Sequence, residues 1–141
     1  MKNVKNDFNI YSNTTMQLTL HSINNIKIGE ITSDKVILKT TEDGLTLLGN
    51  LYYQGYDKII LHEKNITPQF FDLKTGIAGE ILQKFAQYRI PLAIVGDFSK
   101  YTSNSLRDFI FESNKGKFIS FVSTREEAIK ILAGGFYKKR R

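Results

Sequence analysis

The sequence contains no cysteine, and this absence removes several kinds of chemistry. Disulfides, zinc sites with thiolate ligands and a cysteine nucleophile are all excluded. Histidine is also scarce, since His21 and His62 are the only two. A zinc-protease helix needs a second histidine four residues after the first, but position 66 is isoleucine. We therefore expect neither a metal ion nor another bound cofactor.

Long apolar runs are missing as well. No run approaches the roughly 20 residues that a bilayer-spanning helix requires. The first residues, "MKNVKNDFNIYSNTT", contain no apolar stretch of signal-peptide length. We expect a cytoplasmic protein with no membrane partner.

The positive charge is concentrated at the end of the chain. The net charge is +6, from 20 basic and 14 acidic residues, and the last four residues are "KKRR". Without these four, 16 basic residues face 14 acidic ones. The basicity is therefore a property of the tail, and nucleic-acid binding ranks below the other partner classes.

Hydrophobic patterning divides the chain into a flexible lead over 1–15, a domain over 16–135 and a basic tail over 136–141. Within the domain, alternating and short apolar runs predict strands, and apolar stripes at helical spacing predict helices. The predicted strands cover 16–23, 26–31, 58–62, 91–96 and 117–122, and 35–40 extends or follows the second of them. The predicted helices cover about 41–54, 75–88, 102–116 and 125–133.

This element order predicts an α/β fold with a single mixed sheet, in which a hairpin precedes parallel strands, and about four helices. Strands separated by helices imply right-handed parallel crossovers. In open sheets of this kind, ligands gather at the carboxyl ends of the strands. The polar residues at those ends are the candidate ligand or interface loops: His62, Glu63, Asp97, Ser99 and Lys100.

Sequence motifs of common enzyme classes are missing. The chain has neither a P-loop nor the nucleophile elbow G-x-S-x-G, and the G-x-x-G in "TGIAG" is too short for a dinucleotide fingerprint. The hydroxyl-rich run "GDFSKYTSNS" suits either phosphate binding or simple helix capping. No nucleophilic residue lies at a recognisable spacing from a residue that could act as its general base, so we expect no enzymatic activity.

The run "FFDLKTGIAGEILQKF" contains two glycines, Gly76 and Gly79, where a helix begins. Glycine costs a helix roughly 1 kcal/mol per residue, so some interaction must offset it. One explanation is close packing of the helix on a neighbour. The other is functional, because Thr75 would present its hydroxyl at the positive end of the helix dipole, where added phosphate is stabilised.

The element order and three stretches resemble the STAS domain, the fold of bacterial anti-sigma-factor antagonists, over residues 23–132. The first stretch is "GEI" at 29–31, which is similar to the Gly-Glu-Leu that ends a STAS strand. The second is "TGIAGEIL" at 75–82, and the third is "SNSLRDFIFESNKGKFISFVSTREEAI" at 103–129. The chain also resembles an uncharacterised bacterial family of STAS-like proteins.

The resemblance implies a regulatory module that binds a protein partner. Thr75 matches the serine at which STAS domains are phosphorylated, and Gly76 matches the glycine after it. Lys74 and Asp72 complete the candidate partner-binding loop, although leucine stands at position 73, where the family has aspartate. The alternative is a sensor of a nucleotide or small anion in the strand-end crevice. A dimer is compatible with both hypotheses.

Overall fold

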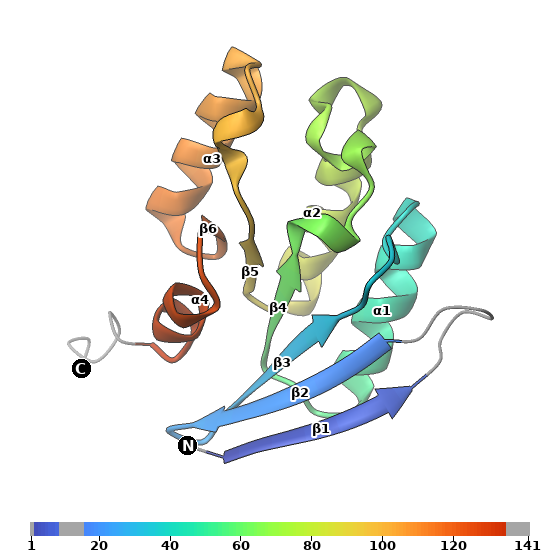
Figure 1. Cartoon of the computed structure of the whole chain (residues 1–141), viewed down its shortest axis with the longest axis vertical. Coiled ribbons are helices and arrows are strands. Elements are labelled where there is room, and N and C mark those ends of the chain that lie inside the picture. The colour runs from blue at the N-terminus through green and yellow to red at the C-terminus, as the bar shows by residue number, and fades with distance from the viewer. Residues whose placement is uncertain (1, 9–15, 135–141) are drawn as a thin grey trace.

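The computed structural model describes residues 2–8, by their backbone, and residues 16–134 (Figure 1). Residues 9–15 of the predicted lead and the whole predicted tail, 136–141, lie outside the described part. One sheet with the strand order β1-β2-β3-β4-β5-β6 crosses the molecule. Its strands are β1 (Lys2–Phe8), β2 (Met16–Ile23), β3 (Ile26–Thr32), β4 (Lys58–His62), β5 (Leu92–Val95) and β6 (Ile119–Val122).

The sheet is mixed, as the sequence predicts. β2 and β3 form the predicted antiparallel hairpin, and β3, β4, β5 and β6 are parallel neighbours. Asn24 and Asn25 make the turn of the hairpin with positive φ angles of 53° and 66°. Asparagine tolerates this left-handed conformation better than most residues, which explains its use in a tight turn.

β1 differs from the prediction of a flexible lead over residues 1–15. Residues 2–8 pair antiparallel with β2, from Lys2 opposite Ser22 to Phe8 opposite Met16. The sheet therefore gains a sixth strand at its N-terminal edge. The segment shows no clear alternation of apolar and polar residues, so its strand structure follows from pairing with β2 and not from a local pattern.

The described part of the chain contains four α-helices and several short 3-10 turns; three of the helices connect strands, and the fourth follows the last strand. The helices are α1 (Thr41–Tyr53), α2 (Ile77–Tyr88), α3 (Asn104–Gly116) and α4 (Arg125–Leu132). Hydroxyl side chains cap three of them, because the oxygens of Thr40, Ser103 and Thr124 accept first-turn amide hydrogens. These caps agree with the Ser and Thr residues that marked helix starts in the sequence.

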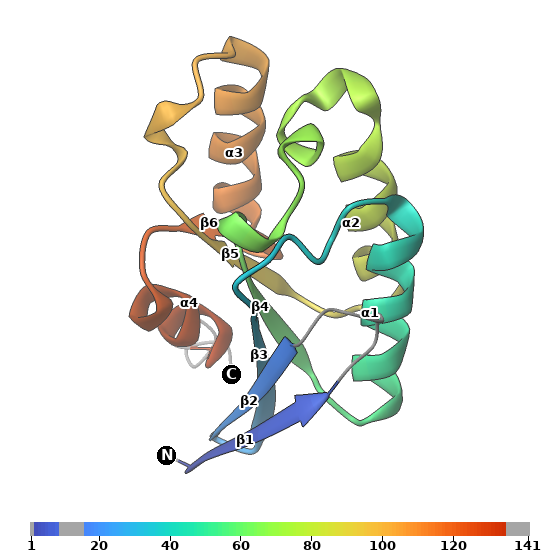
Figure 2. The ribbon, with the colours of Figure 1, turned by 45° about the vertical axis from the view of Figure 1, so that its right-hand side comes forward.

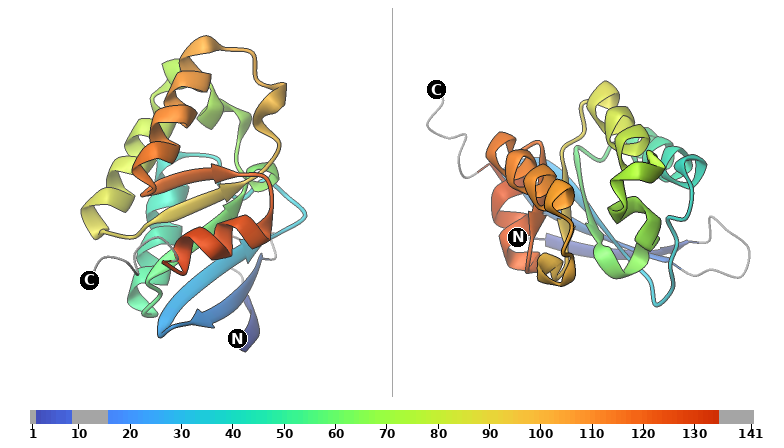
Figure 3. Two further views of the ribbon diagram at one scale, coloured as in Figure 1. Left: turned by 90° about the vertical axis from the view of Figure 1, so that its left-hand side faces the viewer. Right: turned by 90° about the horizontal axis from the view of Figure 1, so that it is seen from above.

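Helices cover both faces of the sheet, as the two views of Figure 3 show. Residues Ile59 and Leu61 of β4 belong to the main core beneath α1, α2 and α3, whereas Ile60 belongs to a smaller cluster beneath α4. This division follows from the strand period of two residues. The crossovers that contain α1, α2 and α3 all lie on one face because the parallel strands follow their chain order.

Consecutive strand order also removes the topological switch point at which doubly wound sheets bind ligands. Each parallel strand lies next to the strand that precedes it in the chain, so the strand order never reverses across the sheet. The carboxyl ends of β4, β5 and β6 instead support three connecting loops along one edge (Figure 2). The predicted crevice at the strand ends therefore corresponds to a row of loops at the carboxyl ends of β4, β5 and β6.

The close-packing explanation for Gly76 and Gly79 is wrong. A Cβ atom added at either position would meet no heavy atom within 4 Å. Gly76 is needed for its conformation, since its φ of 81° is left-handed. Gly79 lies on the exposed side of α2. The terminator of α3 also differs from the prediction, because Lys117, with φ of 62°, and not Gly116, adopts the left-handed conformation.

These two glycines predict opposite effects on stability. Gly79→Ala should raise the free energy of unfolding by roughly 0.5 to 1 kcal/mol, because alanine favours the helix and has open space there. Gly76→Ala should lower it by about 1 to 2 kcal/mol, because alanine resists a positive φ. Urea denaturation of both variants measures these changes, and equal effects at the two positions would contradict the assignment.

Candidate functional site

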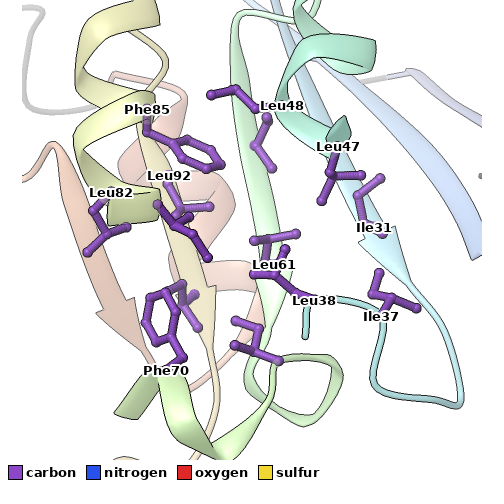
Figure 4. Packing of buried hydrophobic residues seen from close by; sticks show 14 of the residues in the cluster. Ile31, Ile37, Leu38, Leu47, Leu48, Leu61, Phe70, Leu82, Phe85 and Leu92 are labelled. Carbon is purple, nitrogen blue, oxygen red and sulfur yellow. The ribbon is translucent and has the colours of Figure 1, made fainter. Parts of the chain in front are cut away.

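The loops at the carboxyl ends of β4 and β5 bring together most of the predicted site residues. The loop after β4 runs from Glu63 to Gly76 and contains three 3-10 turns. Phe70 and Phe71 in this loop are 2% and 4% exposed. Figure 4 shows Phe70 pointing into the core near Leu82 and Leu92. The loop is thus anchored by its own aromatic side chains.

Glu63 is the centre of a polar network between the two loops. Its Oε2 accepts a hydrogen bond from the Tyr101 hydroxyl at 2.5 Å and lies 2.7 Å from Nζ of Lys100. Gly96 makes room for this side chain, because a Cβ there would lie 2.5 Å from Cβ of Glu63. The network therefore depends on a glycine at the end of β5, and it joins the predicted residues Glu63 and Lys100 directly.

Tyr101 is held as a neutral hydrogen-bond donor. Burial raises the pKa of its hydroxyl well above the usual value, and the hydrogen bond to Glu63 and the charge of Glu63 raise it further. Its ring stacks on Phe71, with ring centroids 5.1 Å apart. The tyrosine thus links the loop after β4 to the loop after β5 through both its polar and its apolar parts.

Asp97 and Ser99 form a local turn. Oδ1 of Asp97 accepts hydrogen bonds from the Ser99 hydroxyl at 2.6 Å and from the Ser99 amide at 3.1 Å. These bonds lower the pKa of the Asp97 carboxyl below its usual value. Both side chains are exposed. Their contacts agree with the capping explanation for the hydroxyl-rich run, and the turn still leaves Asp97 open to solvent.

The hydroxyl of Thr75 is fully engaged, although the residue is exposed. Oγ1 donates towards the carbonyl oxygens of Gln69 at 2.8 Å and Asp72 at 3.0 Å. It accepts the amide hydrogen of Ile77, at the start of α2, at 3.2 Å. The side chain of Asp72 accepts from the amide of Lys74 at 3.2 Å. Thr75 and Asp72 therefore hold the shape of the loop that leads into α2.

Two adjoining depressions separate this loop from the start of α3. They share Asp72, Leu73 and Ser103. The apolar side chains of one depression come from Phe71, Leu73, Tyr101 and Leu106. Lys74 and Lys100 contribute the basic side chains of the two depressions. We call this surface the loop groove. Its volumes are about 290 Å³ and 490 Å³, and a third depression of about 430 Å³ lies over Gly96, Asp97 and Ser99.

His62 does not lie with these residues, although it precedes Glu63. Its side chain points to the α4 side of the sheet, where Nε2 lies 2.6 Å from Oε2 of Glu30. Nε2 of His21 lies 2.8 Å from Oε1 of the same carboxylate. Nε of Arg125 completes the arrangement, at 2.9 Å and 2.8 Å from the two oxygens. We call these four residues the Glu30 cluster.

The carboxylate of Glu30 is buried yet ionised. Burial alone would raise its pKa, but hydrogen bonds from His62, His21 and Arg125, together with the charge of Arg125, outweigh it. The pKa of Glu30 falls to about 2 from the usual 4.5. Both histidines must then donate an Nε2 hydrogen, because an ionised carboxylate can only accept. Within residues 16–134 no group of three or more metal-binding side chains has the arrangement to hold a metal ion.

The sequence hypothesis missed Glu30, His21, Arg125 and Tyr101. One signal was available for the first of them, because a glutamate inside the apolar strand "IKIGEI" must find partners if it is buried. The partners themselves were not accessible, since Arg125 lies 95 residues from Glu30 along the chain. Asn65 was missed as well, and its Nδ2 fixes the loop after β3 by donating to the carbonyls of Ser33 and Lys35.

The family of the chain is shown by a comparison with family models. Residues 23–132 match the model described as "Domain of unknown function (DUF4180)". The chain belongs to this family. Neither the search of curated proteins nor the search of solved structures finds a match for this DUF4180 chain. These findings do not confirm the STAS resemblance. None of the helices that the structure describes is long and apolar enough to span a membrane.

Glu30 predicts a specific dependence of stability on pH. Its pKa is lower in the folded chain than in the unfolded one, so its contribution is complete above about pH 4.5 and is lost as the pH falls towards 2. The shift corresponds to at most about 3 kcal/mol. Urea denaturation from pH 6 to 2 should show a larger loss for the wild type than for Glu30→Gln, because other carboxylates, such as Asp97, titrate in both proteins. Glu42→Gln, at an exposed site in α1, is the control and should follow the wild type.

Thr75 predicts a difference between two small substitutions. Thr75→Ala removes all three hydrogen bonds of the hydroxyl and should lower the free energy of unfolding by roughly 1 to 2 kcal/mol. Thr75→Ser keeps the hydroxyl and should lose less than about 0.5 kcal/mol. Denaturation curves compare the two variants. A loss in Thr75→Ser as large as that in Thr75→Ala would contradict a role for the hydrogen bonds.

Proposed function

We propose that this DUF4180 protein is a non-enzymatic regulatory module that binds an acidic segment of a protein partner in the loop groove. The observation that carries the proposal is the groove itself, which lies between two loops fixed by the network of Glu63, Lys100 and Tyr101. Because these loops are held before binding, a partner would pay little entropy to order them.

Charge and shape favour an acidic partner segment. Lys74 is exposed and lies beside the groove, and Lys100 is half-exposed and paired with Glu63. Asp72 also lines the groove, where Oδ1 accepts the amide hydrogen of Lys74. The groove ends at the first turn of α3, whose free amide hydrogens add positive potential. Leu73, Tyr101 and Leu106 line the groove and give one hydrophobic side chain of the segment apolar contacts. An acidic residue next to a hydrophobic one would therefore match this surface.

The hydrogen bonds of Thr75 change what phosphorylation of this residue would do. A phosphorylated threonine has lost its hydroxyl hydrogen, so it cannot donate to the carbonyls of Gln69 and Asp72. Phosphorylation would also place negative charge beside Lys74. If Thr75 is a switch, as the STAS resemblance implies, phosphate would reshape the loop groove and weaken the binding of an acidic segment.

A second candidate is a sensor of a small anion or nucleotide at the carboxyl ends of β5 and β6. It is favoured by the depression over Gly96, Asp97 and Ser99, because its volume of about 430 Å³ falls in the range of small-molecule sites. The exposed carboxylate of Asp97 argues for a ligand with hydroxyl or amino groups there. A thermal-shift screen of nucleotides tests this candidate, and uniformly unchanged melting would contradict it.

The partner proposal is tested by site-specific photo-crosslinking in cells. A benzoylphenylalanine placed at Ser105, inside the loop groove, should form an adduct with one partner, and the mapped segment should be acidic. Adding Lys74→Glu should reduce the adduct several-fold, because it reverses the charge beside the groove. The same probe at Lys130, which is exposed on α4, is the matched control and should give no such adduct.

Two outcomes would contradict the proposal. One is an equal adduct from Ser105 and Lys130, which would indicate contact without specificity. The other is a partner segment whose crosslinking is insensitive to Lys74→Glu. Circular dichroism of the purified variants separates loss of binding from loss of folding.

A further inference from the structure

Arg125 is fixed at one end of its guanidinium group and open at the other. Its Nε donates to both oxygens of Glu30, whose side chain is 2% exposed, whereas the Arg125 side chain is 48% exposed. The two terminal amino groups of Arg125 form no hydrogen bond with any residue in the described ranges. Four N–H donors therefore remain at the surface, on a group whose position is set by a buried carboxylate.

His62 is held in a similar way. Its Nε2 donates to Oε2 of Glu30, and its side chain is only 14% exposed. Its Nδ1 has no hydrogen-bond partner among the residues that the structure describes. This nitrogen accepts a hydrogen bond when the ring is neutral and donates one when the ring is protonated. The ring therefore offers one polar atom on a side chain that shares the Glu30 carboxylate with Arg125.

The charge of the Glu30 cluster does not oppose an anion. Arg125 balances the single negative charge of Glu30, so the buried carboxylate leaves no excess negative charge at this surface. Of the two acidic residues in the first turn of α4, Glu127 accepts the amide hydrogen of Ser123, and Glu126 is exposed. Buried ion clusters are often less stable than apolar packing, so their stability alone does not account for this one.

We propose that the open amino groups of Arg125 bind two oxygens of a small oxyanion, either a phosphate or a carboxylate, on the α4 side of the sheet, and that Nδ1 of His62 accepts a hydrogen bond from the remaining hydroxyl of a hydrogen phosphate. The two terminal amino groups of a guanidinium match two oxygens of such an anion. Because Glu30 fixes the Nε end, this geometry exists before the anion binds. The site lies on the opposite face of the sheet from the core beneath α1, α2 and α3, and it is independent of the loop groove.

NMR titration of the labelled protein tests the site directly. Sodium phosphate and sodium acetate are added in separate titrations, with chloride holding the ionic strength constant. The anion that saturates the shifts at the lower concentration identifies the anion class. The Nε–H signal of Arg125 and the ring signals of His62 should shift and saturate. The signal of Arg107, an exposed arginine of α3, is the internal control and should not follow them.

Variants separate the guanidinium geometry from charge. Arg125→Lys keeps a positive charge facing Glu30 but removes the pair of terminal amino groups, so the anion should bind at least about tenfold more weakly. Arg107→Lys should bind like the wild type. If Arg125→Lys does not fold, the comparison of Arg125 with Arg107 in the wild type still decides. Equal shifts at both arginines, or shifts confined to Ser99 and Asp97, would overturn the proposal.

Discussion

The buried carboxylate of Glu30 links the last helix to strands that backbone pairing already joins in one sheet. It receives hydrogen bonds from His21 on β2, from His62 at the end of β4 and from Arg125 at the start of α4. A charge in this position is tolerated only because each partner is in place. The hairpin, the parallel strands and the last helix are thus coupled through one side chain.

The end of β4 sends two consecutive polar residues to opposite sides of the sheet. His62 reaches Glu30 on the α4 side, while Glu63 joins Tyr101 and Lys100 between the loops on the other side. The strand period of two explains this separation. The candidate oxyanion site and the loop groove therefore share a backbone segment without sharing a side chain, so a change in the position of β4 would affect both.

Much of the fold could be predicted from the sequence, because hydrophobic periodicity and helix caps are local signals. The hairpin, the parallel strands and the Thr124 cap follow from such patterns. β1 could not be predicted, since its pairing depends on β2. At the site, the sequence correctly pointed to Glu63 and Lys100, but it grouped them with His62, which lies on the other side of the sheet. It also missed Glu30, because the partner Arg125 is 95 residues away.

Strand order that follows chain order has a consequence for how the protein is assembled on the ribosome. Each new strand from β2 to β6 pairs with the strand that precedes it, so most of the sheet grows by addition of the most recent element. The ion pair of Glu30 with Arg125 is different, because its second member is synthesised near the end of the chain. Until α4 emerges, the growing sheet carries a carboxylate without its arginine, and the last helix supplies the charge that balances Glu30.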